Sequence, residues 1–264
     1  MTQNLTGRCG AAFILAMAIV SAPPALAANA AAEGPQPPMT GLPGGPLLVP
    51  PANQDINGVW WTTTYNARVL PTEGGELPFT PAGRAAYEKN VAGLRARTIV
   101  DQARYSCTPD GVPRIWQSPY PFQVFQTPGQ ATFYYERNRV LRVVYMDRPL
   151  PDKDTLEALP WFSGHSVGKW EGDTLVVETA GFKDSTFLDD SGVPNSDQLR
   201  VVERLRKLNA GKELELVVTI TDPVNFTRPW NTRFIFSARP DIRLDTQVCG
   251  EKLRDISQVR GAVP

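Results

Sequence analysis

Residues 164–182 read GHSVGKWEGDTLVVETAGF, and this stretch contains the only histidine of the chain, His165. Polar and apolar residues alternate on both sides of a Gly-Asp pair, which is typical of two antiparallel strands joined by a tight turn. If Gly172 and Asp173 are the central residues of that turn, His165 and Glu178 lie on one face of the hairpin as diagonal neighbours. The stretch therefore predicts a β-hairpin with a carboxylate within reach of the histidine.

A histidine beside a carboxylate is a candidate acid–base pair. The carboxylate stabilises the imidazolium and holds the ring in one tautomer, so we expect His165 to be the catalytic acid–base and Glu178 its orienting partner. The alternative is a structural histidine that donates one hydrogen bond in a barrel wall. A shift of one residue in the turn would separate the two side chains onto opposite faces, so the catalytic interpretation depends on this register.

The same stretch also matches the serine-hydrolase pattern G-x-S-x-G around Ser166. That pattern needs a histidine base, which in an α/β-hydrolase follows the serine in the chain, and it places the serine between a strand and a helix. No histidine follows His165, and the residues after Ser166 predict turn and strand. The sequence therefore argues against a Ser-His-Asp hydrolase.

A period of two continues through most of the chain from residue 121 onward, and turn-forming pairs such as Pro-Gly and Gly-Asp interrupt it. The strand-length segments are FQVFQT, ATFYYER, RVLRVVYM, HSVGKW, TLVVETAGF, QLRVVERLRKL, ELELVVTIT and TRFIFSA, with INGVWWTTTY before them. Because open strand edges aggregate, so many strands must close or stack. The sequence predicts a mainly β fold: an antiparallel up-and-down barrel of lipocalin or calycin type, or a strongly curved sheet. A flat two-sheet sandwich is the alternative.

One N-terminal helix is expected near residues 80–97. Thr80 can cap it, Pro81 suits its first turn, and AGRAAYEKNVAGLRAR is rich in helix-forming residues. Gly93 is expected to weaken or end the helix.

The first residues predict a cleaved signal peptide, 1–27, with Arg8 before a short apolar core and an A-x-A site at its end. Residues 28–55 form a Pro/Gly/Ala-rich arm, and 56–264 are expected to form a single barrel-like domain. The chain carries 27 basic and 27 acidic residues, so loss of Arg8 leaves a net charge near −1. We expect a periplasmic or secreted protein that binds no nucleic acid and has no membrane span.

Two cysteines follow the signal peptide, Cys107 and Cys249. An even number in an oxidising compartment predicts a disulfide between them, with two buried thiols as the alternative. One histidine and two distant cysteines lack the spacing of a metal site, and the aspartates of FKDSTFLDDSG lack that of a calcium loop. With no nucleotide or phosphate-loop motif either, we expect no metal and no cofactor.

Substrate-binding candidates come from two segments. The proline- and aromatic-rich segment CTPDGVPRIWQSPYPF contains Arg114, Trp116 and Tyr120, and such loops often form the mouth of a barrel. Arg114 is expected to fix a ligand oxygen or, alternatively, to extend along the surface over Trp116. Tyr134 and Glu136 alternate onto one face of the following strand, which is either an inner wall that orients a ligand or an outward polar stripe.

The string GHSVGKWEGDTLVVETAGF, with FLDDSGVPNSDQLRVVERL and VTITDPVNFTRPW after it, resembles a widespread family of secreted bacterial proteins of uncharacterised activity. The resemblance covers most of residues 56–250 and implies an envelope β protein, without implying an activity. Where the family pattern has Pro-His-Ser, this chain has Pro194-Asn195-Ser196, so any role of a second histidine is absent. The GVW near the first strand is similar to lipocalin-type barrels.

Two functions are open at this point. The first is a cofactor-independent acid–base enzyme, a lyase or isomerase, that acts on a hydrophobic or aromatic small molecule bound in the barrel or at its mouth. The second is a non-catalytic periplasmic binding or carrier protein for such a molecule. A structural envelope protein is a third interpretation. The sequence predicts neither the substrate nor the oligomeric state.

Overall fold

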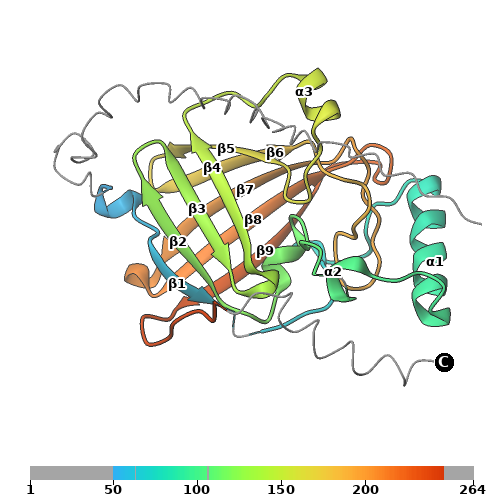
Figure 1. Cartoon of the computed structure of the whole chain (residues 1–264), viewed down its shortest axis with the longest axis horizontal. Coiled ribbons are helices and arrows are strands. Elements are labelled where there is room, and N and C mark those ends of the chain that lie inside the picture. Colours follow the sequence, from blue (N-terminus) through green and yellow to red (C-terminus); the bar gives the residue numbers. More distant parts are fainter. Residues whose placement is uncertain (1–49, 63, 106, 247–264) are drawn as a thin grey trace, which may run out of the picture. The chain divides into compact units, whose positions relative to one another are not determined.

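A computed structural model describes residues 50–62, 64–105 and 107–246, and within them nine strands form a closed barrel in chain order (Figure 1). The strands are β1 (Gly58–Trp61), β2 (Phe122–Thr127), β3 (Gln130–Tyr135), β4 (Val140–Met146), β5 (His165–Glu171), β6 (Thr174–Ala180), β7 (Arg200–Leu208), β8 (Glu213–Thr221) and β9 (Trp230–Ala238). The helices are α1 (Pro81–Ala96), α2 (Gln102–Tyr105) and α3 (Lys153–Ala158), with 3-10 turns η1 (Ala52–Gln54), η2 (Arg114–Gln117), η3 (Arg137–Arg139) and η4 (Asn209–Gly211). The mainly β fold and the barrel architecture are confirmed.

One pair of neighbouring strands, β4 and β5, is parallel, and every other pair is antiparallel. Nine strands cannot alternate in direction around a closed ring, because nine is odd, so the ring needs a parallel pair. A parallel pair requires a long crossover connection, and residues 147–164 with α3 supply it. The simple up-and-down order is therefore interrupted once, directly before the histidine-bearing strand.

The hairpin of β5 and β6 has the register that the turn predicts. Val167 faces Glu178, and Glu171 faces Thr174 across the Gly172-Asp173 turn. Gly172 has a φ of 64°, which a glycine adopts without strain. Residues of β5 and β6 therefore alternate between the two faces of the wall as expected.

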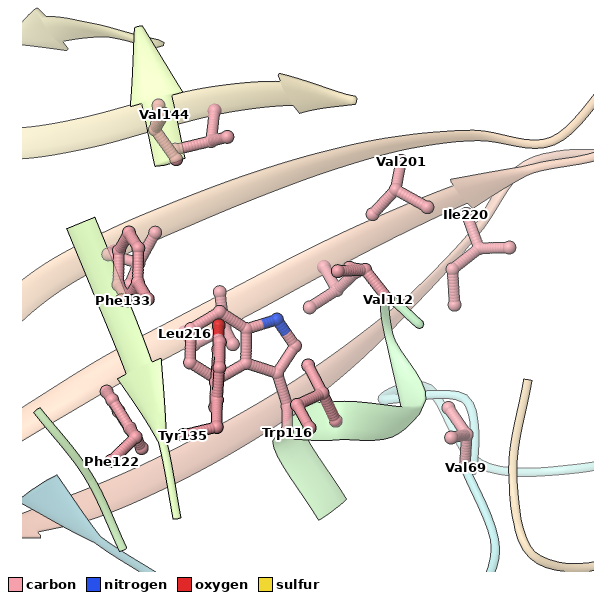
Figure 2. Close-up of a cluster of buried hydrophobic side chains, with 14 of the residues drawn as sticks. Val69, Val112, Trp116, Phe122, Phe133, Tyr135, Val144, Val201, Leu216 and Ile220 are labelled. Carbon is pink, nitrogen blue, oxygen red and sulfur yellow. The ribbon is translucent and has the colours of Figure 1, made fainter. Parts of the chain in front are cut away.

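The barrel interior is filled by side chains around Trp116, which η2 inserts from one end (Figure 2). Its ring centroid lies 5.1 Å from that of Phe122, 5.2 Å from Tyr135 and 5.8 Å from Phe236. Several of these contacts are edge-to-face, the arrangement that aromatic quadrupoles favour. The interior is thus a packed core, and Trp116 is part of it.

The predicted N-terminal helix is confirmed as α1. The Thr80 hydroxyl accepts a hydrogen bond from the Gly83 backbone N–H at 2.9 Å, and the helix ends at Arg97 in the left-handed conformation. Gly83 lies so close to the backbone of Asn225 that a Cβ atom would overlap it. The glycine therefore allows α1 to dock closely on the loop between β8 and β9.

Within the described part of the chain, no helix has the length and apolar character needed to cross a membrane. The predicted signal peptide, most of the predicted arm, and Cys249 lie outside the described residues.

Candidate functional site

A buried ion pair crosses the barrel interior between Arg142 on β4 and Glu203 on β7. The Arg142 Nη1 donates to the Glu203 carboxylate at 2.9 Å, its Nη2 donates to the other carboxylate oxygen, and the Trp116 indole N–H donates to Glu203 at 2.6 Å. The Arg142 Nε also donates to the Ser166 hydroxyl at 3.0 Å, and its Nη2 donates to the Thr179 hydroxyl at 2.9 Å. Ser166 therefore faces inward and is held by the guanidinium, which gives it a packing and hydrogen-bonding role.

Burial opposes the charge of Arg142, but Glu203 more than compensates, so that the pKa of the guanidinium is raised overall. A buried ion pair of this kind is tolerated only when its remaining donors and acceptors are satisfied. Here the Ser166 and Thr179 hydroxyls accept the remaining hydrogen bonds of Arg142. Sequence reasoning did not single out this pair as a functional group.

Arg114, a predicted ligand-binding residue, is buried in a second cluster at the end of the barrel where η2 lies. It donates two hydrogen bonds to Asp101, at 2.9 and 2.5 Å, and two to Asp190, at 2.9 and 2.6 Å, and Asp110 lies 3.5 Å away. Burial lowers the pKa of Arg114, but the three aspartates raise it overall. The donors expected to fix a ligand oxygen are therefore occupied within the protein, and a ligand-binding role of Arg114 finds no support in this geometry.

The other predicted substrate-binding residues do not line either of the two clefts described below. Tyr120 is exposed on the loop before β2. The Tyr134 hydroxyl donates to the backbone oxygen of Asp245 at 3.2 Å, and the Glu136 carboxylate accepts from the Asp245 N–H at 2.8 Å. Tyr134 and Glu136 thus fasten the segment after β9 to the region of β3.

His165 and Glu178 share the outer face of the barrel wall, but each has a different partner. The His165 Nε2 lies 2.7 Å from the backbone oxygen of Leu159, and its ring stacks on Trp161 at a centroid distance of 4.1 Å. Glu178 forms a long ion pair of 3.6 Å with Arg200. The partners of His165 lie in the crossover after β4, and the partner of Glu178 lies on β7, so neither belongs to the hairpin. The predicted register is therefore correct, but it does not lead to the expected pairing of His165 with Glu178.

A cleft of about 450 Å³ lies where the crossover passes over the outer face of β4 and β5, and His165 is one of its walls. We call it the outer cleft, lined by Leu141, Arg142, Val143, Tyr145, Arg148, Pro149, Pro151, Trp161, Ser163, Gly164, His165, Ser166 and Val167. Two of its aromatic side chains are exposed to solvent, Trp161 at 55% and Tyr145 at 45% relative exposure. Exposed aromatic groups around a concave surface are typical of a small-molecule site.

The polar groups of the outer cleft are few. Because a carbonyl oxygen only accepts, the bond to Leu159 requires the proton on Nε2, and in the neutral ring Nδ1 of His165 then carries a lone pair. The Arg148 guanidinium lies 5.6 Å from the centre of the Tyr145 ring. Among the described residues, no aspartate or glutamate lines this cleft.

A larger cleft of about 670 Å³, the end cleft, lies between α3 and the strand ends of β6, β7 and β8. Its positively charged residues are Lys153, Lys183 and Arg200, and its negatively charged residues are Glu157, Asp184 and Asp197. Lys153 already pairs with Glu157 at 3.4 Å, and Lys183 lies over the ring of Phe162 at 4.6 Å. With balanced charges and fewer aromatic residues, the end cleft fits an apolar ligand less well than the outer cleft.

Asp189, which precedes β7, binds backbone N–H groups. Asp189 accepts hydrogen bonds from the N–H groups of Ser191 at 2.9 Å and Val193 at 3.2 Å, as expected of a turn-forming residue. The described residues contain no group of three or more His, Cys, Asp and Glu side chains arranged to hold a metal ion.

Comparisons with known proteins leave the chain without an assigned family: no family model matches it, and no curated protein sequence matches it.

Proposed function

We propose that this protein binds a hydrophobic or aromatic small molecule in the outer cleft. The observation that carries the proposal is the pair of exposed aromatic rings, Trp161 and Tyr145, in a cleft of about 450 Å³. That volume lies within the range of roughly 300–1,000 Å³ typical of small-molecule sites. The packed barrel core makes the outer wall, rather than the interior, the place for such a ligand.

Binding without catalysis is the function that this geometry favours. An acid–base histidine is usually oriented and stabilised by a carboxylate, and Glu178 is engaged by Arg200 instead. Together with the expected signal peptide, the resemblance to secreted bacterial proteins suggests a periplasmic binding or carrier protein.

Acid–base catalysis by His165 alone is the second candidate, and one observation favours it. The hydrogen bond from Nε2 to Leu159 leaves the Nδ1 lone pair of the neutral ring available as a base. The reaction would be of the lyase or isomerase type on the same class of ligand, without a cofactor.

Fluorescence titration with the neutral apolar probe N-phenyl-1-naphthylamine tests the proposal. Trp161→Ala removes the exposed stacking surface, and we expect it to weaken probe binding by about tenfold, the effect of one aromatic stacking contact. Tyr120→Ala is the matched control, because Tyr120 is also an exposed aromatic residue but does not line the outer cleft. Equal probe affinity of the parent and Trp161→Ala would show that the outer cleft is not the binding site.

The two candidates are separated by the fate of the bound molecule. A compound that co-purifies with the protein is incubated with the parent and with His165→Asn and followed by mass spectrometry. Binding alone predicts an unchanged compound in both samples. A product formed by the parent and absent with His165→Asn would instead favour catalysis.

A further inference from the structure

We propose that the ligand of the outer cleft is an aromatic carboxylate, and that Arg148 binds its carboxylate group. This inference rests on the proposed function, since it names the ligand class for the same cleft.

The charge of the cleft is the first argument. In the part of the chain that the structure describes, its charged lining residues are Arg142 and Arg148, with no aspartate or glutamate. The charge of Arg142 is balanced inside the barrel by Glu203, so the uncompensated positive charge of the cleft is that of Arg148. An apolar cleft with one uncompensated cation selects an apolar molecule with one negative charge.

The second argument is the state of the Arg148 side chain. Within the described part of the chain it forms no ion pair and no side-chain hydrogen bond, and the neighbouring Asp147 is not paired with it. Its guanidinium instead lies over the Tyr145 ring, 5.6 Å from the ring centre. A cation–π contact of this kind does not use the N–H donors of the guanidinium as hydrogen-bond donors, so they can bind the two oxygens of a carboxylate.

Two prolines restrict the backbone conformation next to Arg148. Pro149 follows Arg148 directly, Pro151 comes two residues later, and both line the cleft. Proline fixes its own φ and restricts the residue before it, so the segment carrying Arg148 has little conformational freedom to lose when a ligand binds. The backbone that carries Arg148 is therefore restricted before a ligand binds, which lowers the entropic cost of binding.

The rest of the cleft suits the aromatic part of the ligand. Trp161 and Tyr145 offer the ring surface that His165 and Arg148 leave exposed, and Leu141 and Val167 add aliphatic surface. A two-ring aromatic acid therefore combines the two features that the cleft presents: a large apolar lining and one cation.

The test compares two probes that share a ring system and differ in charge, 2-naphthoate and 2-naphthylmethanol, by isothermal titration at low ionic strength. We expect the parent to bind 2-naphthoate about tenfold more tightly than the alcohol, the fold-change of one charge-assisted hydrogen-bonded pair. Arg148→Gln should remove this preference and leave the affinity for the alcohol unchanged. Arg148→Lys should retain part of it, because lysine keeps the charge but not the bidentate geometry.

Arg95→Gln is the control substitution, since Arg95 is another exposed arginine without an ion pair and lies on α1, away from the cleft lining. It should leave the preference for 2-naphthoate intact. Arg148 is exposed, so its variants are expected to fold normally, and circular dichroism checks this.

The outcomes separate this inference from the proposed function. If both probes bind the parent equally, or if Arg148→Gln keeps the preference, the carboxylate assignment is wrong while binding in the cleft stands. If neither probe binds, and Trp161→Ala also leaves N-phenyl-1-naphthylamine binding unchanged, the proposed function itself fails.

Discussion

Arg142 and Glu203 show how a pair of residues acquires its role from the barrel rather than from a motif. Each is a charged residue at an inward position whose neighbours on the same face are apolar, Arg142 between Val140 and Val144, and Glu203 between Val201 and Leu205. The period-two alternation that predicts the strands also places both side chains inside, so a signal for a buried pair was present in the sequence. That they meet across the interior depends on the order and stagger of strands β4 and β7.

Among the single substitutions considered, we expect Glu203→Gln, which breaks the buried ion pair, to lower the stability of the protein most. Glu203→Gln leaves the Arg142 charge buried without a counterion, so we expect the free energy of unfolding to fall by about 3–5 kcal/mol. Equilibrium urea denaturation measures it.

Two further variants make this prediction specific. Arg204→Gln breaks an exposed ion pair with Glu171 and should cost less than about 1 kcal/mol. The double variant Arg142→Met with Glu203→Leu removes both charges and should recover most of the lost stability. A loss for Glu203→Gln no greater than that for Arg204→Gln would contradict the assignment of a stabilising buried pair.

Among the elements, the β5–β6 hairpin is the one that the sequence predicts in full, because a two-residue turn and the alternation of its strands determine the register locally. The pairing of β5 with β4 is different. It is parallel, covers only the stretch from Val144 to Met146 on β4, and follows a crossover of irregular structure and one short helix. No local turn chemistry encodes such a pairing, and the antiparallel expectation misses it.

The close approach of β4 and β5 predicts a steric effect at Gly168. A Cβ atom there would lie 2.8 Å from the Val144 Cγ1 and 3.1 Å from the Met146 Sδ, both within the packed wall. We expect Gly168→Ala to destabilise the protein by about 1–3 kcal/mol through overpacking, measured as a shift in the urea midpoint.

A double-mutant cycle supplies the control for this contact. Val144→Ala removes the obstructing methyl group, so Gly168→Ala should cost clearly less in that background than in the parent. Additive effects of the two substitutions would mean that Gly168 and Val144 do not contact each other as the structure has them.

At the level of the whole molecule, the barrel is closed by pairing β1 with β9, and the segment after β9 returns to the region of β3 and η3. There Arg139 contacts Asp245 at 3.0 Å, and the side-chain amide of Asn138 donates to the backbone oxygen of Thr108 at 2.9 Å. Thr108, the residue after Cys107, therefore contacts η3 through Asn138. Asp245, which precedes Cys249 by four residues, contacts η3 through Arg139.

This arrangement bears on the expected disulfide between Cys107 and Cys249, which stays a prediction because Cys249 lies outside the described residues. We expect proteolysis under non-reducing conditions to release the two cysteine-containing peptides as one linked species by mass spectrometry. A loop of this length should contribute roughly 4–5 kcal/mol in the chain-entropy model, so reduction should lower the urea midpoint. Free thiols on both cysteines in protein purified under oxidising conditions would refute the pairing.

The chain alone determines the class of fold, α1 with its cap, and the register of the β5–β6 hairpin, because periodicity, capping and turn chemistry act over a few neighbouring residues. The candidate site was decided only by the tertiary structure. Trp161 and Leu159 reach His165 through the crossover, Arg200 reaches Glu178 from β7, and Arg114 is enclosed by aspartates from separate segments. Arg200 and Asp190 are far along the chain from the residues they contact, so a local pattern carries no information about these contacts. Leu159 and Trp161 are only six and four residues from His165, but their contacts depend on how the irregular crossover folds back on β5.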